Sequence, residues 1–151
     1  MTPHEKKAIE LFRKGCNCSQ AVFAAFSDVT GIDESTAIKM SAPFGGGLGR
    51  LREVCGAVSG MSLAAGVLWG YNDLENKELK TEHYKLISDM ATRFAEEMDG
   101  SYICRNILKI TTTEYNPVAE DRTSAYYENR PCERCVALAA RILDSEIEKR
   151  K

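Results

Sequence analysis

Apolar positions along this chain recur mostly at every third or fourth residue, which is the spacing of one face of an α-helix. Strand-like alternation is almost absent, and capping residues, glycines and prolines separate the helical stretches. The pattern predicts an all-α fold, a single-domain bundle of about six to seven helices. The predicted helices begin near Thr2, Asn17, Asp33, Arg52, Glu75, Ser101 and Pro131.

The segment at 52–69 is the expected central helix, because it is apolar on nearly all sides. Gly56, Gly60 and Ala64 follow one another at four-residue spacing, and small side chains in this register let a neighbouring backbone approach closely. No charged residue occurs at 54–71, but four glycines and two serines interrupt that stretch. We therefore expect a buried helix of a soluble protein and no membrane insertion.

Two further segments have a distinct character. The helix at 75–98 carries one wide apolar stripe that includes Leu79, Met98 and His83, and we expect His83 to be an ordinary packed histidine. Residues 111–130 form a polar connection longer than most loops in a compact domain. This connection is either a lid or partner-binding segment, or an irregular surface excursion.

Charge and composition narrow the functional classes. The formal net charge is −2, and no run of Lys or Arg alternates with aromatic residues, so we expect no nucleic-acid partner. The first 15 residues are charged throughout and lack the apolar core of a secretory signal, which predicts a cytoplasmic protein.

Six cysteines are the unusual feature of the composition. In a reducing compartment, structural disulfides are disfavoured, so cysteine enrichment indicates metal binding or thiol chemistry. Four of the six, Cys18, Cys55, Cys104 and Cys132, fall in or near the first turn of four different predicted helices. The positive end of the helix dipole favours the thiolate, which is both the nucleophile and the metal ligand. At least one of the four is expected to have a pKa below the ordinary value of about 8.5.

If these helix starts meet, the four cysteines can form a tetrathiolate site for zinc, hold an iron–sulfur cluster, or form a pair of reversible disulfides. If they do not meet, dithiol pairs or isolated core thiols result. Cys132 and Cys135 have CxxC spacing, but no strand precedes them, as a thioredoxin-like motif requires. With only two histidines, a base for cysteine-nucleophile catalysis is not identifiable, and enzyme activity stays undecided.

A glycine-rich loop leads directly into the helix that carries Cys55. Its backbone N–H groups and the Arg50 and Arg52 charges are suited to holding an anion or admitting a cofactor, although a flexible turn explains the glycines equally well. The candidate cofactor-binding residues of this loop are Gly45, Gly46, Gly47, Gly49 and Arg50.

The run Cys55-Gly56-Ala57-Val58-Ser59-Gly60 resembles the central motif of the C_GCAxxG_C_C family of redox-active proteins. The resemblance extends from about residue 10 to residue 145. It implies a redox role for four cysteines, which correspond here to Cys18, Cys55, Cys104 and Cys132, with Cys16 and Cys135 as additions of this chain. Cys135 lies one helical turn from Cys132 and is the alternative fourth member.

Two functional hypotheses follow. The first is a cysteine-based redox or electron-transfer protein that uses thiols, a metal or an iron–sulfur cluster. The second is a binding module that zinc or packed thiols stabilise and that serves a partner. The resemblance also suggests a membrane transporter or a redox protein as the partner, and a homo-oligomer is a further expectation.

Overall fold

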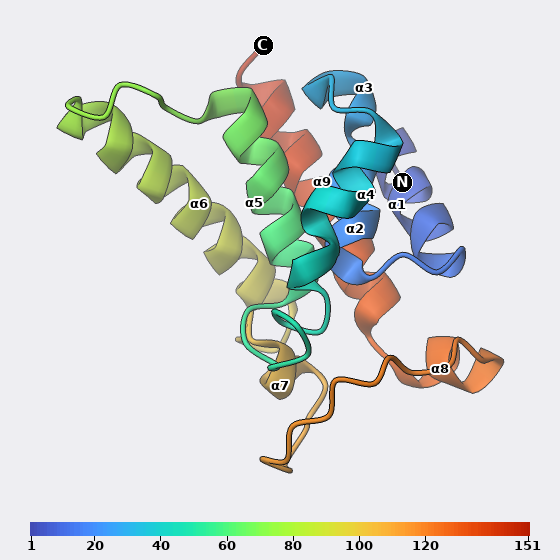
Figure 1. The fold of residues 1–151 in the computed structure, drawn as a ribbon. Helices are drawn as coiled ribbons and strands as arrows, with labels where there is room; N and C mark the ends of the chain where they lie inside the picture. The colour runs from blue at the N-terminus through green and yellow to red at the C-terminus, as the bar shows by residue number, and fades with distance from the viewer.

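The computed structural model describes all 151 residues and consists of helices joined by turns and loops, with no β-sheet (Figure 1). The predicted all-α fold is confirmed. The elements are α1 (Pro3–Arg13), α2 (Cys18–Ala25), α3 (Ser27–Thr30), α4 (Glu34–Ser41), the 3-10 turn η1 (Ala42–Phe44), α5 (Gly56–Trp69), α6 (Lys77–Glu97), α7 (Cys104–Ile107), α8 (Ser124–Asn129) and α9 (Cys132–Lys149). The two helices beyond the predicted seven are the short α3 and α8.

Side-chain caps define the first helices. Thr2 and Glu5 form a capping box at the start of α1, and Asn17 and Gln20 form one at the start of α2. Both helices begin where the sequence predicts. The apolar spacing from Val22 to Val29 would suit one continuous helix, but α2 ends at Ala25 and Val29 is exposed on α3.

The core of the bundle lies where α2, α5 and α9 pack together, with α1 and α4 against α2. The expected close approach occurs between α5 and α2. A Cβ atom on Gly60 would lie 2.5 Å from the carbonyl oxygen of Ser19, so no larger residue fits there without separating the helices. The small-residue register predicted for α5 therefore sets the distance between two core helices.

The structure differs from the sequence pattern at the start of α5 and in the burial of α6. Residues 52–55 are not helical, because Arg52 has a φ of 65° and Val54 forms an isolated antiparallel bridge with Ile103. The apolar stripe of α6 is buried only in its C-terminal half, where Leu86, Met90 and Phe94 enter the core, whereas Leu79 is exposed. The N-terminal half of α6 extends away from α5 in Figure 1.

The remaining features concern the surface. Among the helices, none combines the length and the apolar character needed to cross a membrane. His83 is half-buried with its ring against Tyr71, the ring centroids being 5.9 Å apart. The polar connection at 111–130 contains the short helix α8 at its end and otherwise lacks regular structure.

Candidate functional site

Four helices begin at the same end of the bundle, the lower end in Figure 1, and each begins with a cysteine. Cys55 is the N-cap of α5, and the other three are the first residues of α2, α7 and α9. The thiols line one cavity of about 60 Å³. Its cysteines are Cys18, Cys55, Cys104, Cys132 and Cys135. We call these five residues the thiol cluster.

A short backbone pairing holds Cys55 and Cys104 next to each other. The amide of Cys55 donates to the carbonyl of Tyr102 at 2.8 Å, and the amide of Cys104 donates to the carbonyl of Glu53 at 2.6 Å. These bonds flank the bridge between Val54 and Ile103. The two cysteines thus belong to one antiparallel pair of extended residues, which explains why α5 begins later than its apolar pattern suggests.

Close backbone packing brings Cys18 to the same place. A Cβ on Gly56 would lie 3.3 Å from the Cβ of Cys18, so the first turns of α2 and α5 touch at these residues. Gly47 is equally confined, with a φ of 71°, and a Cβ there would lie 2.8 Å from the Cβ of Cys104. Only glycine combines this conformation with this lack of space. The glycine-rich loop is therefore part of the wall of the thiol cluster.

Cys132 and Cys18 form an unequal pair of thiols. The pKa of Cys132 is lowered to about 7, chiefly because the Cys18 thiol hydrogen-bonds to its sulfur; the guanidinium charges of Arg130 and Arg122 add to this effect, and burial opposes it. The pKa of Cys18 is raised well above its usual value, because Cys18 supplies the hydrogen in this pair and burial disfavours its thiolate. Both residues are half-buried. As the pH rises above about 7 the pair therefore comes to hold one thiolate, on Cys132, and one thiol, on Cys18.

Cys55 and Cys135 form a second pair, and both are buried. Hydrogen bonding from Cys135 lowers the pKa of Cys55 against the effect of burial, and the backbone N–H groups of Ala57 and Val58 contribute to the lowering. The pKa of Cys135 is raised, first by the bond to Cys55 and then by burial. The thiolates expected at helix starts are thus Cys132 and Cys55.

Cys104 stands apart from the two pairs. Burial raises the pKa of its thiol, and Arg52, whose Nη1 lies 3.8 Å from the sulfur, opposes that effect. Cys16 does not line the cavity, and burial raises its pKa as well. The thiol pKa is therefore lowered at two of the four helix starts. Backbone N–H groups contribute to the lowering at Cys55, whereas at Cys132 the causes are the Cys18 thiol and the arginine charges.

Cys135 is the member of the thiol cluster that the sequence presented only as an alternative to Cys132. It lies in the second turn of α9, three residues after Cys132 and on the same face of the helix. That spacing is visible in the sequence, but its partner Cys55 is 80 positions away. Only the packing of α9 against α5 shows that the two thiols meet.

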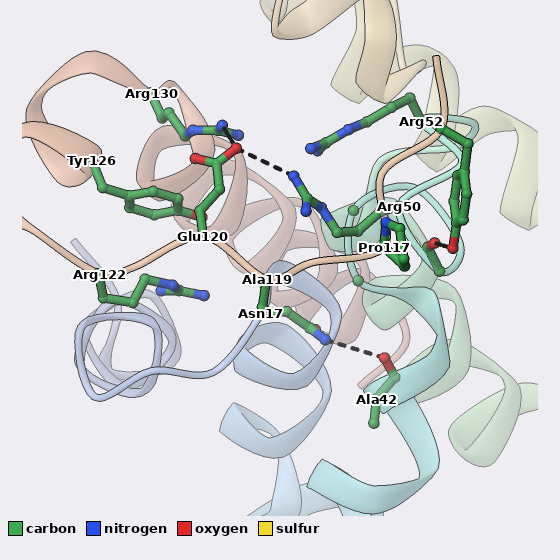
Figure 2. A pocket seen from close by; sticks show the side chains of 14 residues that line it. Asn17, Ala42, Arg50, Arg52, Pro117, Ala119, Glu120, Arg122, Tyr126 and Arg130 are labelled. Atoms are coloured by element: carbon green, nitrogen blue, oxygen red, sulfur yellow. Dashed lines mark hydrogen bonds and ion pairs between the residues drawn. The ribbon is translucent and has the colours of Figure 1, made fainter. Parts of the chain in front are cut away.

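The remaining residues of the glycine-rich loop line a second, more open pocket of about 420 Å³, shown in Figure 2. Gly45, Gly46, Gly49 and Arg50 belong to its lining, whereas Gly47 faces the thiol cluster. Arg50 and Arg52 both have a positive φ, 64° and 65°, a backbone conformation that non-glycine residues rarely adopt. The loop thus consists of one residue confined against the thiols and a group of residues around an open pocket.

A metal or cluster would use the same thiols. Thiolates are the preferred ligands of zinc and of iron–sulfur clusters, so the donor set fits either group. No group of three or more His, Cys, Asp or Glu side chains is arranged to hold a metal ion as the structure stands. A metal on Cys18, Cys55, Cys104 and Cys132 remains a prediction.

Comparison with known proteins bears directly on this site. A search of curated proteins and a search of solved structures each found no match. A family model described as "Putative redox-active protein (C_GCAxxG_C_C)" matches residues 16–146, which include the whole thiol cluster and nearly all of the helices described above. The chain therefore belongs to the C_GCAxxG_C_C family that this model describes.

Proposed function

We propose that this protein is a thiol–disulfide redox protein in which Cys132 is the attacking thiolate and Cys18 the resolving thiol. The observation that carries the proposal is that two half-buried thiols from different helices line one cavity together with Arg122 and Arg130. In this setting the pKa of Cys132 is lowered to about 7 and that of Cys18 is raised. A thiol whose pKa is near the ambient pH combines a high thiolate fraction with good nucleophilicity. Both residues are also less buried than Cys55, Cys104 and Cys135.

The reaction begins when the Cys132 thiolate attacks one sulfur of a substrate disulfide. The substrate S–S bond breaks, a mixed disulfide forms, and one substrate thiolate leaves. The Cys18 thiol then loses its proton to that thiolate and attacks the Cys132 sulfur, which releases the second substrate thiolate. Two electrons pass to the substrate, which becomes one thiol and one thiolate, and Cys18 and Cys132 become a disulfide.

The environment of Cys18 changes during this sequence in a way that favours the second step. Its pKa is raised by hydrogen bonding and by charge repulsion, both of which involve Cys132 as a thiolate. Once Cys132 is in a mixed disulfide, its hydrogen bond and negative charge no longer raise the pKa of Cys18, and burial and the charge of the inner pair are what still disfavour the Cys18 thiolate. Cys18 therefore becomes more acidic when it has to react.

The second pair extends the capacity of the site. A Cys55 thiolate can attack the Cys18–Cys132 disulfide, after which Cys135 resolves the new bond. The outer pair then returns to the dithiol and the inner pair becomes the disulfide. Complete oxidation by an excess of a disulfide would then consume four thiols.

The test is the rate of iodoacetamide alkylation against pH in reduced, metal-free protein. We expect the fastest thiol to be Cys132, with a midpoint near pH 7, and mild oxidation to give a disulfide between Cys18 and Cys132 in peptide mass spectrometry. Cys18→Ala should raise the midpoint, because it removes the hydrogen-bond donor. Cys16→Ala is the matched control, because Cys16 lies outside the cavity and should leave the midpoint unchanged.

Two results would refute the assignment. One is slow alkylation of Cys132 at neutral pH with no sensitivity to Cys18→Ala. The other is zinc, or iron with inorganic sulfide, bound tightly to the anaerobically purified protein so that the thiols do not react. The second result would favour the metal-thiolate form of the redox hypothesis, or the zinc-stabilised binding module, over thiol exchange.

A further inference from the structure

The open pocket of Figure 2 is joined to the thiol cluster by a shared wall. Six residues line both spaces, so a molecule in the pocket lies directly beside the thiols. The shared residues are Asn17, Gly46, Arg52, Arg122, Tyr126 and Arg130. At about 420 Å³ the pocket has the size of a small-molecule site, whereas the cavity at the thiols is too small for more than a reacting group.

Arginines give this pocket an excess of positive charge. Arg50, Arg52, Arg122 and Arg130 belong to its lining, and Glu120 is the one acidic residue among them. In Figure 2 the Glu120 carboxylate lies between the guanidinium groups of Arg130 and Arg50. Glu120 pairs with Arg130 and, at 3.3 Å, with Nη2 of Arg50. One side-chain carboxylate therefore occupies the position in which the arginines would hold a carboxylate of a ligand.

The bonding of the arginines is unequal. Arg122 is committed to the fold, because its two Nη atoms donate to the carbonyls of Phe12 and Cys16 at 3.1 and 3.0 Å. Arg50 has a free donor, because its Nη1 is buried and has no hydrogen-bond partner. A buried guanidinium nitrogen without a partner is costly unless an acceptor reaches it. An incoming anion would supply that acceptor.

We propose that the arginine-lined pocket binds a carboxylate of a small anionic disulfide and presents the S–S bond of that molecule to Cys132. The inference rests on the proposed function, because it names the substrate class of the same site. Glu120 gives up its place between Arg50 and Arg130 to the substrate carboxylate. Glu120 lies in the irregular segment before α8. A hydrogen bond from the Tyr115 hydroxyl to the carbonyl of Gly49 connects this segment to the glycine-rich loop.

Arg50 is the informative position for a test. It lines the open pocket but not the cavity at the thiols, so its replacement removes no side chain from the lining around Cys132. Arg52, Arg122 and Arg130 line both and would change the thiols as well. Arg50→Gln should weaken anion binding, and Glu120→Gln should strengthen it, because the variant removes the competing carboxylate.

The kinetic experiment compares three disulfides of similar size and different charge. They are 3,3′-dithiodipropionate, with two carboxylates, bis(2-hydroxyethyl) disulfide, which is neutral, and cystamine, with two ammonium groups. The rate constant for oxidation of the reduced protein is divided by that of dithiothreitol with the same disulfide, which removes differences between the leaving groups. We expect the normalised rate for the anion to exceed that for the neutral disulfide about tenfold, the effect of one charge-assisted contact. High salt should reduce this preference.

The binding experiment uses suberate, a dicarboxylate that matches 3,3′-dithiodipropionate in length and has no sulfur. Calorimetry should show binding to Cys132→Ser protein, about tenfold weaker in Cys132→Ser/Arg50→Gln and tighter in Cys132→Ser/Glu120→Gln. The control is Cys132→Ser/Arg141→Gln, because Arg141 carries the same charge on the exposed side of α9 and pairs only with Glu97. Its affinity should equal that of Cys132→Ser.

The two proposals can fail separately. Disulfide reduction without a preference for the anion, together with no suberate binding, would overturn the arginine pocket and leave the thiol chemistry intact. Suberate binding that depends on Arg50, in a protein that reduces none of the three disulfides, would support the anion pocket and remove the redox function. An affinity of Cys132→Ser/Glu120→Gln no higher than that of Cys132→Ser would overturn the role of Glu120 as the group that the ligand displaces.

Discussion

Replacing Gly60 with alanine tests the packing that places the thiols, and Gly66→Ala is its matched control on the same helix. A Cβ on Gly60 would lie 2.5 Å from the carbonyl oxygen of Ser19 and 3.1 Å from its Cα. These are backbone atoms of α2 and cannot rotate away. A Cβ on Gly66 would meet nothing within 4 Å.

The two variants should change the free energy of unfolding in opposite directions. Alanine stabilises the interior of a helix relative to glycine by about 0.5–1 kcal/mol, so Gly66→Ala should raise the free energy of unfolding by that amount. Gly60→Ala has the same local gain but forces α2 and α5 apart, and overpacking of this kind costs about 1–3 kcal/mol. The net effect at Gly60 should be a loss of about 1–2 kcal/mol.

Urea denaturation followed by circular dichroism measures both variants, and the difference between their midpoints is the decisive quantity. Ser19 follows Cys18 directly, so a shift of α2 against α5 also moves Cys18 relative to Cys55. Gly60→Ala should therefore change the alkylation midpoint of Cys132 as well, whereas Gly66→Ala should not. If both variants are stabilised alike, the close contact between α2 and α5 does not exist and this account of how the cluster is positioned is wrong.

Three further predictions concern other parts of the fold. Burial lowers the pKa of His4, but hydrogen bonds to Asp28 and Asp144 outweigh burial and raise that pKa. The stabilisation from charged His4 is therefore complete below the unfolded pKa of about 6.5 and is lost as the pH rises through the folded pKa. The stability difference between wild type and His4→Gln, from urea midpoints across that range, should shrink with increasing pH; a constant difference would contradict this. Leu48 is exposed and has a φ of 72°, a conformation that glycine adopts without the strain of a side chain. Leu48→Gly should therefore leave the stability in thermal unfolding unchanged or raise it by up to about 1 kcal/mol. A clear loss of stability would show that the Leu48 side chain matters more than its backbone conformation. Asn17→Ala should cost about 1 kcal/mol through loss of the α2 cap, and an unchanged urea midpoint would argue against the cap.

The sequence predicted the features of the fold that depend on neighbouring residues. The Thr2 and Asn17 caps give the starts of α1 and α2, and the Gly56, Gly60, Ala64 register gives the close helix contact. It failed where a distant partner decides the local structure. Apolar periodicity at 52–55 reads as helix, but the bridge from Val54 to Ile103 holds these residues extended.

In the candidate site too, the sequence predicted the local features and missed those that depend on packing. The placement of four cysteines at helix starts followed from caps and periodicity, but their convergence depends on how α2, α5, α7 and α9 pack, which no local pattern contains. The same reason explains why the sequence presented Cys135 only as an alternative to Cys132. The helix-dipole argument favoured the thiolate at helix starts, but the pKa is raised at Cys18, chiefly by its hydrogen bond to Cys132, and at Cys104, chiefly by burial. The charges beside Cys132 belong to Arg122 and Arg130. Both lie in the segment 111–130, which the sequence showed only as a long polar connection.

Cys18 and Cys132 meet at the lower end of the bundle but come from opposite ends of the chain, and this separation makes a bond between them a cross-link of the whole fold. A disulfide between Cys18 and Cys132 would join the beginning of α2 to the beginning of α9 and close a loop of more than a hundred residues. Closing a loop of about that length removes enough freedom from the unfolded chain to stabilise a protein by about 4–5 kcal/mol in the chain-entropy account. The oxidised protein would then resist urea and proteases that open the reduced one, so that the redox state of two side chains would set the lifetime of the entire molecule.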